Sequence, residues 1–313
     1  MAEAVNQMDR LTVNLHLTER CNFACTYCFA RWDRSDEIFA DKKKFSQFLR
    51  FIEEQARLGL GVKHLTLNFA GGEPALFRHL ETGVEQCRAL GINTSVITNG
   101  LLFRRLSVEK VAELFNIVGV SVDSLNPAIN KLCGRVDRRG VGTDYEEVKQ
   151  GLRLLKRIKP EIITKINTVV SSLNYKEEIK PYVDSCGVNR WKILRVLPLA
   201  GTTSISSEEF SVFLNINAGH PGSIVEDNSD MLRSYVMINS NGHLYQSSEV
   251  AGSIVYKYFD LKDGGLFEGL RRIGFDVSKY RRRYRAEGGF KGFENSSEGI
   301  RFKSAPQSKA TAT

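Results

Sequence analysis

Three cysteines lie in one short segment of the chain. Cys21, Cys25 and Cys28 have the spacing C-x3-C-x2-C, with an aromatic residue directly before the third cysteine. Three thiolates this close in sequence can bind three corners of a four-iron, four-sulfur cluster, whereas electron-transfer clusters are normally held by four cysteines. The fourth iron would then have no protein ligand, so the spacing indicates that another molecule binds there.

Zinc and disulfides explain these cysteines less well. Structural zinc takes four ligands, usually as two spaced pairs, and the chain has no second C-x-x-C pair, while His16 lies within a strand-like alternation. Six cysteines in 313 residues are too few for a disulfide-dense protein. The other three, Cys87, Cys133 and Cys186, are far apart, and we expect them to be small buried hydrophobic residues.

A second motif, Ala70-Gly71-Gly72-Glu73-Pro74, follows a strand-like run. Two glycines let a ligand approach the backbone closely, and the glutamate can accept a hydrogen bond from an ammonium group. A plain turn is the alternative when the motif is taken alone. It is not a P-loop, because no Gly-Lys-Ser/Thr follows.

Polar residues also follow or occupy the later strand-like runs. Residues 97–100 are either a simple turn or part of a site, and the segment from Ser121 to Ser124 offers candidates for binding ribose hydroxyls. On the next two runs Lys165 shares a face with Asn167, and Arg190 shares a face with Lys192. Burying such groups unpaired is costly. They therefore either face the surface or bind an anion, and cations on adjacent strands suit a triphosphate.

Strand-like and helical periodicities alternate along the first two thirds of the chain. Strands are expected near 11–17, 63–70, 93–98, 117–123, 161–170 and 190–199, and helices over 43–58 with Gly59 as the C′ residue, 75–90, and 144–158 capped by Asp144. Six strand–helix units predict an α/β fold with a parallel sheet. Beyond 199 the pattern predicts a helix over 208–214 and a hairpin turning at 239–242.

Composition excludes several classes of protein. The chain has 42% hydrophobic residues, a net charge of +8 and no apolar run near 18 residues, so no transmembrane helix is expected. No signal peptide is evident, and free thiolates suit the cytoplasm. The run from Arg281 to Arg285 is interpreted as a solvated helix or loop, with phosphate binding or loose attraction to RNA as alternatives. No nucleic-acid-binding signature is present, so no specific nucleic-acid partner is expected.

The cysteine and Gly-Gly-Glu-Pro motifs resemble those of radical S-adenosylmethionine (SAM) enzymes. Over 11–290 the chain more specifically resembles the viperin family. The matching residues are Asn14, Ser121-x-Asp123-Ser124, Gly134-Arg135, Lys165-Ile166-Asn167, Arg190-Trp191-Lys192, Glu226-x-Asn228, Ser234-Tyr235 and Gly274-Phe275-Asp276. The chain departs from animal members at Thr66 and Ala70, where they have lysine and serine. The amphipathic membrane-anchoring helix of those members is not expected here.

The resemblance implies a fold and a set of ligands. The fold is a partial (β/α)6 TIM-type radical SAM barrel over 11–200, with a tail at 1–10, an extension at 201–294 that closes the substrate site and a tail at 295–313 that is expected to be disordered. A [4Fe-4S] cluster would be bound by Cys21, Cys25 and Cys28. SAM would contact Gly71, Gly72, Glu73, Ser121 and Arg135, and the substrate would contact Asn14, Lys165, Asn167, Arg190 and Lys192.

The implied activity is that of a lyase that dehydrates a nucleoside triphosphate. CTP is the first candidate, with UTP or GTP as alternatives, and the 3′-deoxy-3′,4′-didehydro product would terminate viral or phage transcripts. Tyr235 is a candidate for handling the proton at the 3′ position. Flavodoxin or ferredoxin would donate electrons, and a monomer is expected. Peptide modification, purine rearrangement and a non-enzymatic iron–sulfur redox sensor are the alternative functions.

Overall fold

The computed structural model describes residues 8–28, 37–199, 204–250 and 253–286. The expected tail at 295–313 and most of the expected tail at 1–10 lie outside these ranges. The strands are β1 (Arg10–His16), β2 (His64–Ala70), β3 (Asn93–Thr98), β4 (Ile117–Ser121), β5 (Ile163–Val170), β6 (Arg190–Arg195), β7 (Ser223–Glu226), β8 (Val236–Ile238), β9 (His243–Val250) and β10 (Ser253–Asp260).

The helices alternate with the first six strands, as the sequence predicts. They are α1 (Lys42–Glu54), continued by the π-helix η2 (Gln55–Gly59), then α2 (Leu80–Ala89), α3 (Leu101–Arg105), α4 (Val108–Leu114), α5 (Pro127–Leu132), α6 (Tyr145–Ile158), α7 (Lys180–Cys186), α8 (Ser207–Ile216), α9 (Asn228–Met231), α10 (Gly265–Arg272) and α11 (Val277–Ala286). Short 3-10 helices η1 (Ile38–Ala40), η3 (Pro74–Leu76) and η4 (Leu261–Asp263) complete the set.

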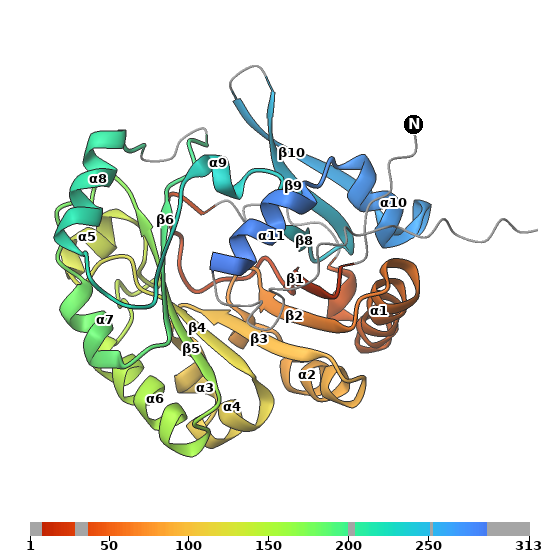
Figure 1. Cartoon of the computed structure of the whole chain (residues 1–313). Helices are drawn as coiled ribbons and strands as arrows, with labels where there is room; N and C mark the ends of the chain where they lie inside the picture. The colour runs from red at the N-terminus through yellow and green to blue at the C-terminus, as the bar shows by residue number, and fades with distance from the viewer. Residues whose placement is uncertain (1–7, 29–36, 200–203, 251–252, 287–313) are drawn as a thin grey trace, which may run out of the picture.

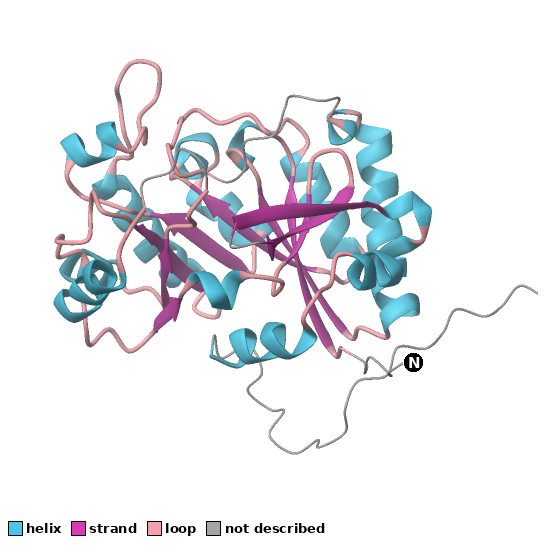
Figure 2. Cartoon of the chain, turned by 90° about the horizontal axis from the view of Figure 1, so that it is seen from above, coloured by secondary structure: helices cyan, strands magenta, loops and turns pink. Residues whose placement is uncertain are grey.

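All ten strands form one sheet in the order β10-β9-β8-β1-β2-β3-β4-β5-β6-β7. Strands β1 to β6 are parallel neighbours in sequence order, which confirms the predicted six-unit parallel sheet. Strand β7, which the sequence analysis missed, extends one edge in parallel with β6. At the other edge β8 lies parallel to β1. The sheet is strongly curved, and most of the helices lie along its outer side (Figures 1 and 2).

Buried and partly exposed side chains alternate along the strands, as β5 shows. In β5, Thr164, Ile166 and Thr168 are buried, whereas Lys165 and Asn167 between them are partly exposed. Successive strand side chains point to opposite faces of a sheet, so one set packs beneath the outer helices and the other faces inward. The outward set contributes to two apolar clusters, one under α1, α2, α4 and α10 and the other under α6, α7 and α8.

Local signals account for several helix ends. The Asp144 side chain accepts hydrogen bonds from the backbone N–H groups of Glu146 and Glu147, which confirms the predicted N-cap of α6. The expectation for Gly59 was wrong, because Gly59 is still helical and Gly61 (φ 68°) takes the left-handed conformation. The predicted hairpin is confirmed as β8–β9, with the Asn239 side chain accepting from the N–H of His243.

None of the helices in the described ranges combines the length and the apolar character that a membrane crossing requires.

Candidate active site

A cavity of about 450 Å³ lies inside the curve of the sheet. All of the residues that the sequence analysis selected for the site line it, except Glu73. The lining combines the cysteine loop with the inward positions of β1 to β6 and residues of the extension. Three candidate groups far apart in sequence, the cysteines, the glycine pair and the strand cations, thus share one space.

The glycine pair packs against the cysteine loop itself. The N–H of Gly72 donates to the carbonyl of Thr18 (2.7 Å), and the N–H of Glu73 donates to the carbonyl of Arg20 (2.8 Å). A Cβ atom at position 72 would lie only 2.1 Å from the Arg20 carbonyl oxygen. Glycine is therefore required at these positions because the backbone of the cysteine loop comes so close. A bound ligand would be a second reason.

A second segment holds the opposite side of the same loop. The N–H of Ala24 donates to the carbonyl of Gly134 (2.9 Å), and the N–H of Thr26 donates to the carbonyl of Cys133 (2.9 Å). Gly134 has φ 71°, and a Cβ there would lie 2.3 Å from the Ala24 carbonyl oxygen. The cysteine loop is therefore fixed between two segments that follow β2 and α5.

Arg135 is the buried cation beneath this loop. Its guanidinium pairs with Asp123 (2.6 Å) and donates to the carbonyl of Ser121 (2.7 Å), and the Tyr27 hydroxyl donates to the same carboxylate. Burial raises the pKa of Tyr27 well above its usual range, with the negative charge of Asp123 acting in the same direction. Asp123 therefore anchors both Arg135 and the loop that carries the cysteines.

The structure places Glu73 away from the cavity lining. Its fully buried carboxyl accepts hydrogen bonds from the Thr98 hydroxyl (2.8 Å) and from the N–H groups of Asn99 (2.8 Å) and Ala75 (3.1 Å). Burial raises its pKa to about 7. In this conformation Glu73 ties the end of β2 to the end of β3. Direct contact of Glu73 with SAM stays a prediction.

The three cysteines lie together at the cavity wall. Burial raises the pKa of Cys21 to about 11 and that of Cys25 to about 12, and the neighbouring thiols add to both shifts. The Asn99 side-chain amide lies 3.8 Å from the Cys21 sulfur. Ligation requires thiolates, so binding iron would release protons. Among the described residues, no group of His, Cys, Asp or Glu is arranged to hold a single metal ion.

The strand cations face the same cavity from neighbouring strands. Lys165 is paired in register with Arg190, and Asn167 with Lys192, which confirms that each predicted pair shares a face. Gly119 on β4 makes room for Lys165, because a Cβ there would lie 2.6 Å from the Lys165 Cε. These positions give one wall of the cavity positive charge and an amide.

Polar side chains continue across the adjoining strands. The Asn68 amide donates to the Asn14 side-chain oxygen (2.7 Å), and the Ser95 hydroxyl donates to the Asn68 oxygen (2.7 Å). The Asn14 amide donates in turn to the carbonyl of Val236 (3.4 Å). Asn14, which lines the cavity, is therefore held in one orientation by β2 and β8.

Lys192 belongs to a charged cluster that includes Tyr235. Its Nζ lies 2.6 Å from the Glu226 carboxylate and donates to the Tyr235 hydroxyl (2.9 Å), which itself donates to Glu226. Burial, followed by the charge of Glu226, raises the pKa of Tyr235, so the phenol keeps its proton near neutral pH. The cluster can therefore hold a proton at the cavity wall.

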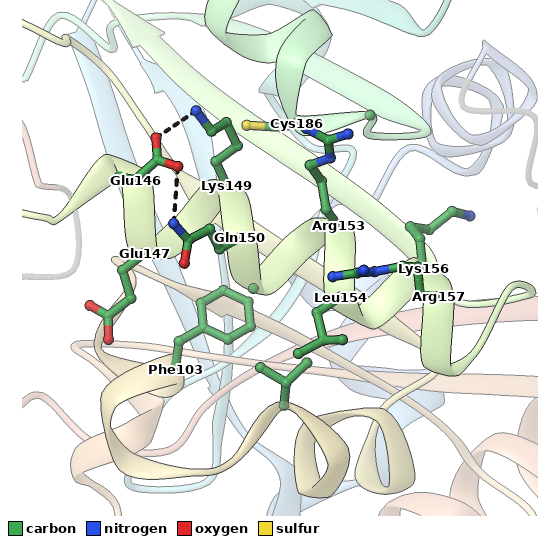
Figure 3. A pocket seen from close by; sticks show the side chains of 13 residues that line it. Phe103, Glu146, Glu147, Lys149, Gln150, Arg153, Leu154, Lys156, Arg157 and Cys186 are labelled. Atoms are coloured by element: carbon green, nitrogen blue, oxygen red, sulfur yellow. Dashed lines mark hydrogen bonds and ion pairs between the residues drawn. The ribbon is translucent and has the colours of Figure 1, made fainter.

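A second hollow, of about 820 Å³, lies on the outer side of the molecule beside α6 (Figure 3). No residue selected from the sequence lines it. Lys149 pairs with Glu146 there, and burial raises the pKa of the Cys186 thiol to about 11. Its residues offer no comparable grouping for chemistry.

Comparison with known sequences gives one family result. The model of the radical SAM superfamily matches residues 15–185. An S-adenosylmethionine-dependent nucleotide dehydratase of Psychrobacter lutiphocae is 33% identical over 88% of this chain and 95% of its own length. A protein of the same name from Selenomonas ruminantium is 31% identical, covering 87% and 98%. The relative named RSAD2 from Siniperca chuatsi is 25% identical, covering 75% and 67%.

Solved structures agree on the fold. SuiB of Streptococcus suis, in a crystal structure with bound S-adenosylmethionine, has a TM-score of 0.56 at 17% identity, covering 91% of this chain and 68% of that one. The structure of anSMEcpe with bound AdoMet has a TM-score of 0.55 at 19% identity, covering 87% and 79%. At such low identities the likeness concerns the fold alone.

Proposed function

Because the chain belongs to the radical SAM superfamily and, within it, to the S-adenosylmethionine-dependent nucleotide dehydratases, we propose that it dehydrates a nucleoside triphosphate, with CTP as the first candidate. The observation that carries this proposal is the shared cavity. Lys165 and Arg190 line the same space as the three cysteines. Cations on adjacent strands bind phosphate oxygens as a point charge and as a fork, respectively.

The product would be the 3′-deoxy-3′,4′-didehydro nucleotide, which makes the enzyme a lyase. A [4Fe-4S] cluster held by Cys21, Cys25 and Cys28 would supply the electron that cleaves S-adenosylmethionine, and the 5′-deoxyadenosyl radical so released would remove the ribose 4′ hydrogen. A nucleotide without a 3′ hydroxyl stops a growing RNA chain, so the proposed role is antiviral or antiphage defence. We further propose a cytoplasmic monomer that receives electrons from flavodoxin or ferredoxin.

Different residues of this chain are proposed to bind the cluster, SAM and the substrate. Cys21, Cys25 and Cys28 would hold the cluster. The proposed SAM site consists of Gly71, Gly72, Glu73, Ser121 and Arg135. The Glu73 carboxyl is hydrogen-bonded to Thr98 and Asn99, and it would act in that site through these two residues. Asn14, Lys165, Asn167, Arg190 and Lys192 are the proposed substrate site.

Loss of the 3′ hydroxyl as water requires a proton. As the C3′–O bond breaks, its electron pair leaves with the oxygen, which must be protonated, and one further electron completes the double bond. Tyr235 is the proposed donor, because it lines the cavity with its proton in place and is hydrogen-bonded to both Lys192 and Glu226. A general acid must lie within hydrogen-bond reach of the group that it protonates.

The preference of the enzyme for one nucleobase would depend on other residues of the cavity. Thr66 and Ala70 replace a lysine and a serine of the animal members, and both line the cavity. Part of the contact surface for the nucleotide therefore differs here. This difference supports testing UTP and GTP as seriously as CTP.

Anaerobic turnover tests the proposal. The cluster is reconstituted, SAM and a strong reductant are added, and ATP, CTP, GTP and UTP are supplied separately. We expect 5′-deoxyadenosine to rise with one triphosphate, together with that nucleotide minus one water. Deoxyadenosine formation that is indifferent to all four nucleotides would reject the proposed substrate class and direct attention to a peptide or another substrate.

A further inference from the structure

We propose that Arg283 of α11 is a positioning residue, which holds Tyr235 and Glu226 in place at the substrate cavity. This inference rests on the proposed function, because it assigns these two residues to the dehydration step. The sequence analysis interpreted the run from Arg281 to Arg285 as a solvated helix or loop, with phosphate binding as an alternative. The structure gives one member of that run a different environment.

The sheet has an open seam next to the cavity. Strands β7 and β8 form opposite edges of the eight parallel strands and are not paired with each other in the described sheet. Glu226 ends β7, whereas Tyr235 directly precedes β8. The two residues that share a hydrogen bond therefore come from separate edges, and strand pairing alone does not fix their relative position.

Helix α11 bridges this seam. The Tyr280 hydroxyl accepts from the N–H of Thr12 (2.7 Å), at a point on β1 before its pairing with β8 begins. The Lys279 ammonium donates to the carbonyl of Ser229 (2.9 Å), in α9. The helix is thus attached both to β1 and to the segment that connects β7 with β8.

Arg283 makes the contacts that join the two edges at the cavity. Its guanidinium donates to the carbonyl of Ser234 (2.9 Å), lies 3.7 Å from the Glu226 carboxylate, and sits 3.6 Å from the centre of the Tyr235 ring. Its side chain is only 4% exposed, and the residue lines the cavity. A cation in this position packs against the face of the phenol and attracts the carboxylate at the same time.

Charge in the cluster supports a positioning role. Lys192 already lies 2.6 Å from Glu226, so the carboxylate has one close cation without Arg283. The guanidinium adds a planar contact and a bond to the Ser234 backbone, which an ammonium group would not reproduce with the same geometry. Arg283 therefore mainly orients Tyr235 and Glu226, and its positive charge is less important for the cluster.

The same helix offers a matched control. Arg282 precedes Arg283 and is exposed to solvent. The variants R283Q and R282Q remove the same charge from the same helix, one from the cavity wall and one from the surface. R283K keeps the charge but loses the planar group, which separates charge from geometry and serves as a second variant if R283Q does not fold.

Two measurements on the full chain test the role. In protein labelled with 3-fluorotyrosine, with the Tyr235 signal assigned by Y235F, we expect R283Q to shift the 19F resonance of Tyr235 and R282Q to leave it in place. In the reconstituted enzyme we expect R283Q to lower kcat by about 100-fold, the order of loss for a small misplacement of a reacting group. KM for the nucleotide should change much less, and R283K should recover part of kcat.

The double variant completes the test. If Arg283 acts through Tyr235, Y235F/R283Q should be no slower than Y235F alone, since coupled residues are not additive. An unmoved resonance in R283Q, or losses that multiply in the double variant, would overturn the inference. Wild-type protein that turns over no nucleotide would instead overturn the proposed function, and the 19F comparison would still decide whether Arg283 orients Tyr235.

Discussion

The Lys192 Nζ lies 2.6 Å from the Glu226 carboxylate, and both side chains are almost completely buried. They come from neighbouring parallel strands, β6 and β7, and the Tyr235 hydroxyl bonds to both. A buried ion pair is retained at a cost in desolvation and is weak evidence for stability. Lys192 lines the cavity, and both partners of the pair are hydrogen-bonded to Tyr235, the residue proposed to donate a proton, which gives the pair a functional explanation.

Replacing Glu226 with glutamine should harm both stability and turnover. The substitution leaves Lys192 buried without its carboxylate, which typically costs about 3–5 kcal/mol, and it replaces the charged acceptor of the Tyr235 hydrogen bond with a neutral amide. Denaturant unfolding and kcat would measure the two effects. Glu268→Gln is the control, because Glu268 pairs with Arg271 and Arg272 on the surface, where ion pairs contribute little. Equal behaviour of the two variants would contradict the assigned role.

Gly72→Ala should prevent assembly of the iron site. The new Cβ would meet the Arg20 carbonyl oxygen at 2.1 Å, which forces the cysteine loop to move. We expect the iron and sulfide content after reconstitution to fall severalfold, while Gly59→Ala, where no atom lies within 4 Å of the added Cβ, should match wild type. Full iron loading of the Gly72 variant would show that the loop does not need this close contact.

Lys165→Ala should abolish nucleotide-dependent cleavage of SAM and leave the iron content unchanged. Lys165 lines the cavity from β5, whereas the cysteine loop is held by backbone hydrogen bonds to the segments that follow β2 and α5. Iron analysis and deoxyadenosine formation would be measured together, with Lys43→Ala, at an exposed position of α1, as the control. Unchanged turnover with nucleotide in the Lys165 variant would count against the proposed phosphate site.

His16 should make the protein sensitive to acid. Burial lowers its pKa to about 3, from an ordinary value of 6.5. Between pH 3 and pH 6.5 the unfolded chain binds up to one more proton than the folded chain, so the stability falls as the pH drops below 6.5. Above pH 6.5 this histidine does not change the stability with pH. At pH 5 the loss is about 2 kcal/mol. His16→Gln should lose less stability between pH 7 and pH 5 than wild type; equal losses would contradict the assignment.

Much of the fold was predictable because the relevant signals are local. Apolar runs rich in Val, Ile and Leu marked each of the six central strands, and Asp144 marked a helix start through contacts within the first turn of that helix. Strand β7 was missed because it is only four residues long, Ser223 to Glu226, and its backbone partners lie on β6. A short edge strand of this kind has little periodicity to detect.

The site was predictable in part for the same reason. Spacing of two residues placed Lys165 with Asn167 on one face, which the structure confirms. The buried role of Arg283 was not predictable, because four of the five residues in its run are arginines. The residues that it contacts, Ser234 and Glu226, are 49 and 57 positions away in the sequence. The bonds of Glu73 to Thr98 and Asn99 likewise depend on how β2 and β3 meet.

The most direct test of the account uses a triphosphate labelled with deuterium at the ribose 4′ carbon, starting with CTP and repeated with UTP and GTP. The reconstituted enzyme is given SAM, reductant and one labelled nucleotide, and mass spectrometry follows both products. The account predicts that deuterium appears in 5′-deoxyadenosine while the same nucleotide loses one water. Deoxyadenosine that carries no deuterium with any labelled triphosphate, or that forms equally without nucleotide, would contradict it.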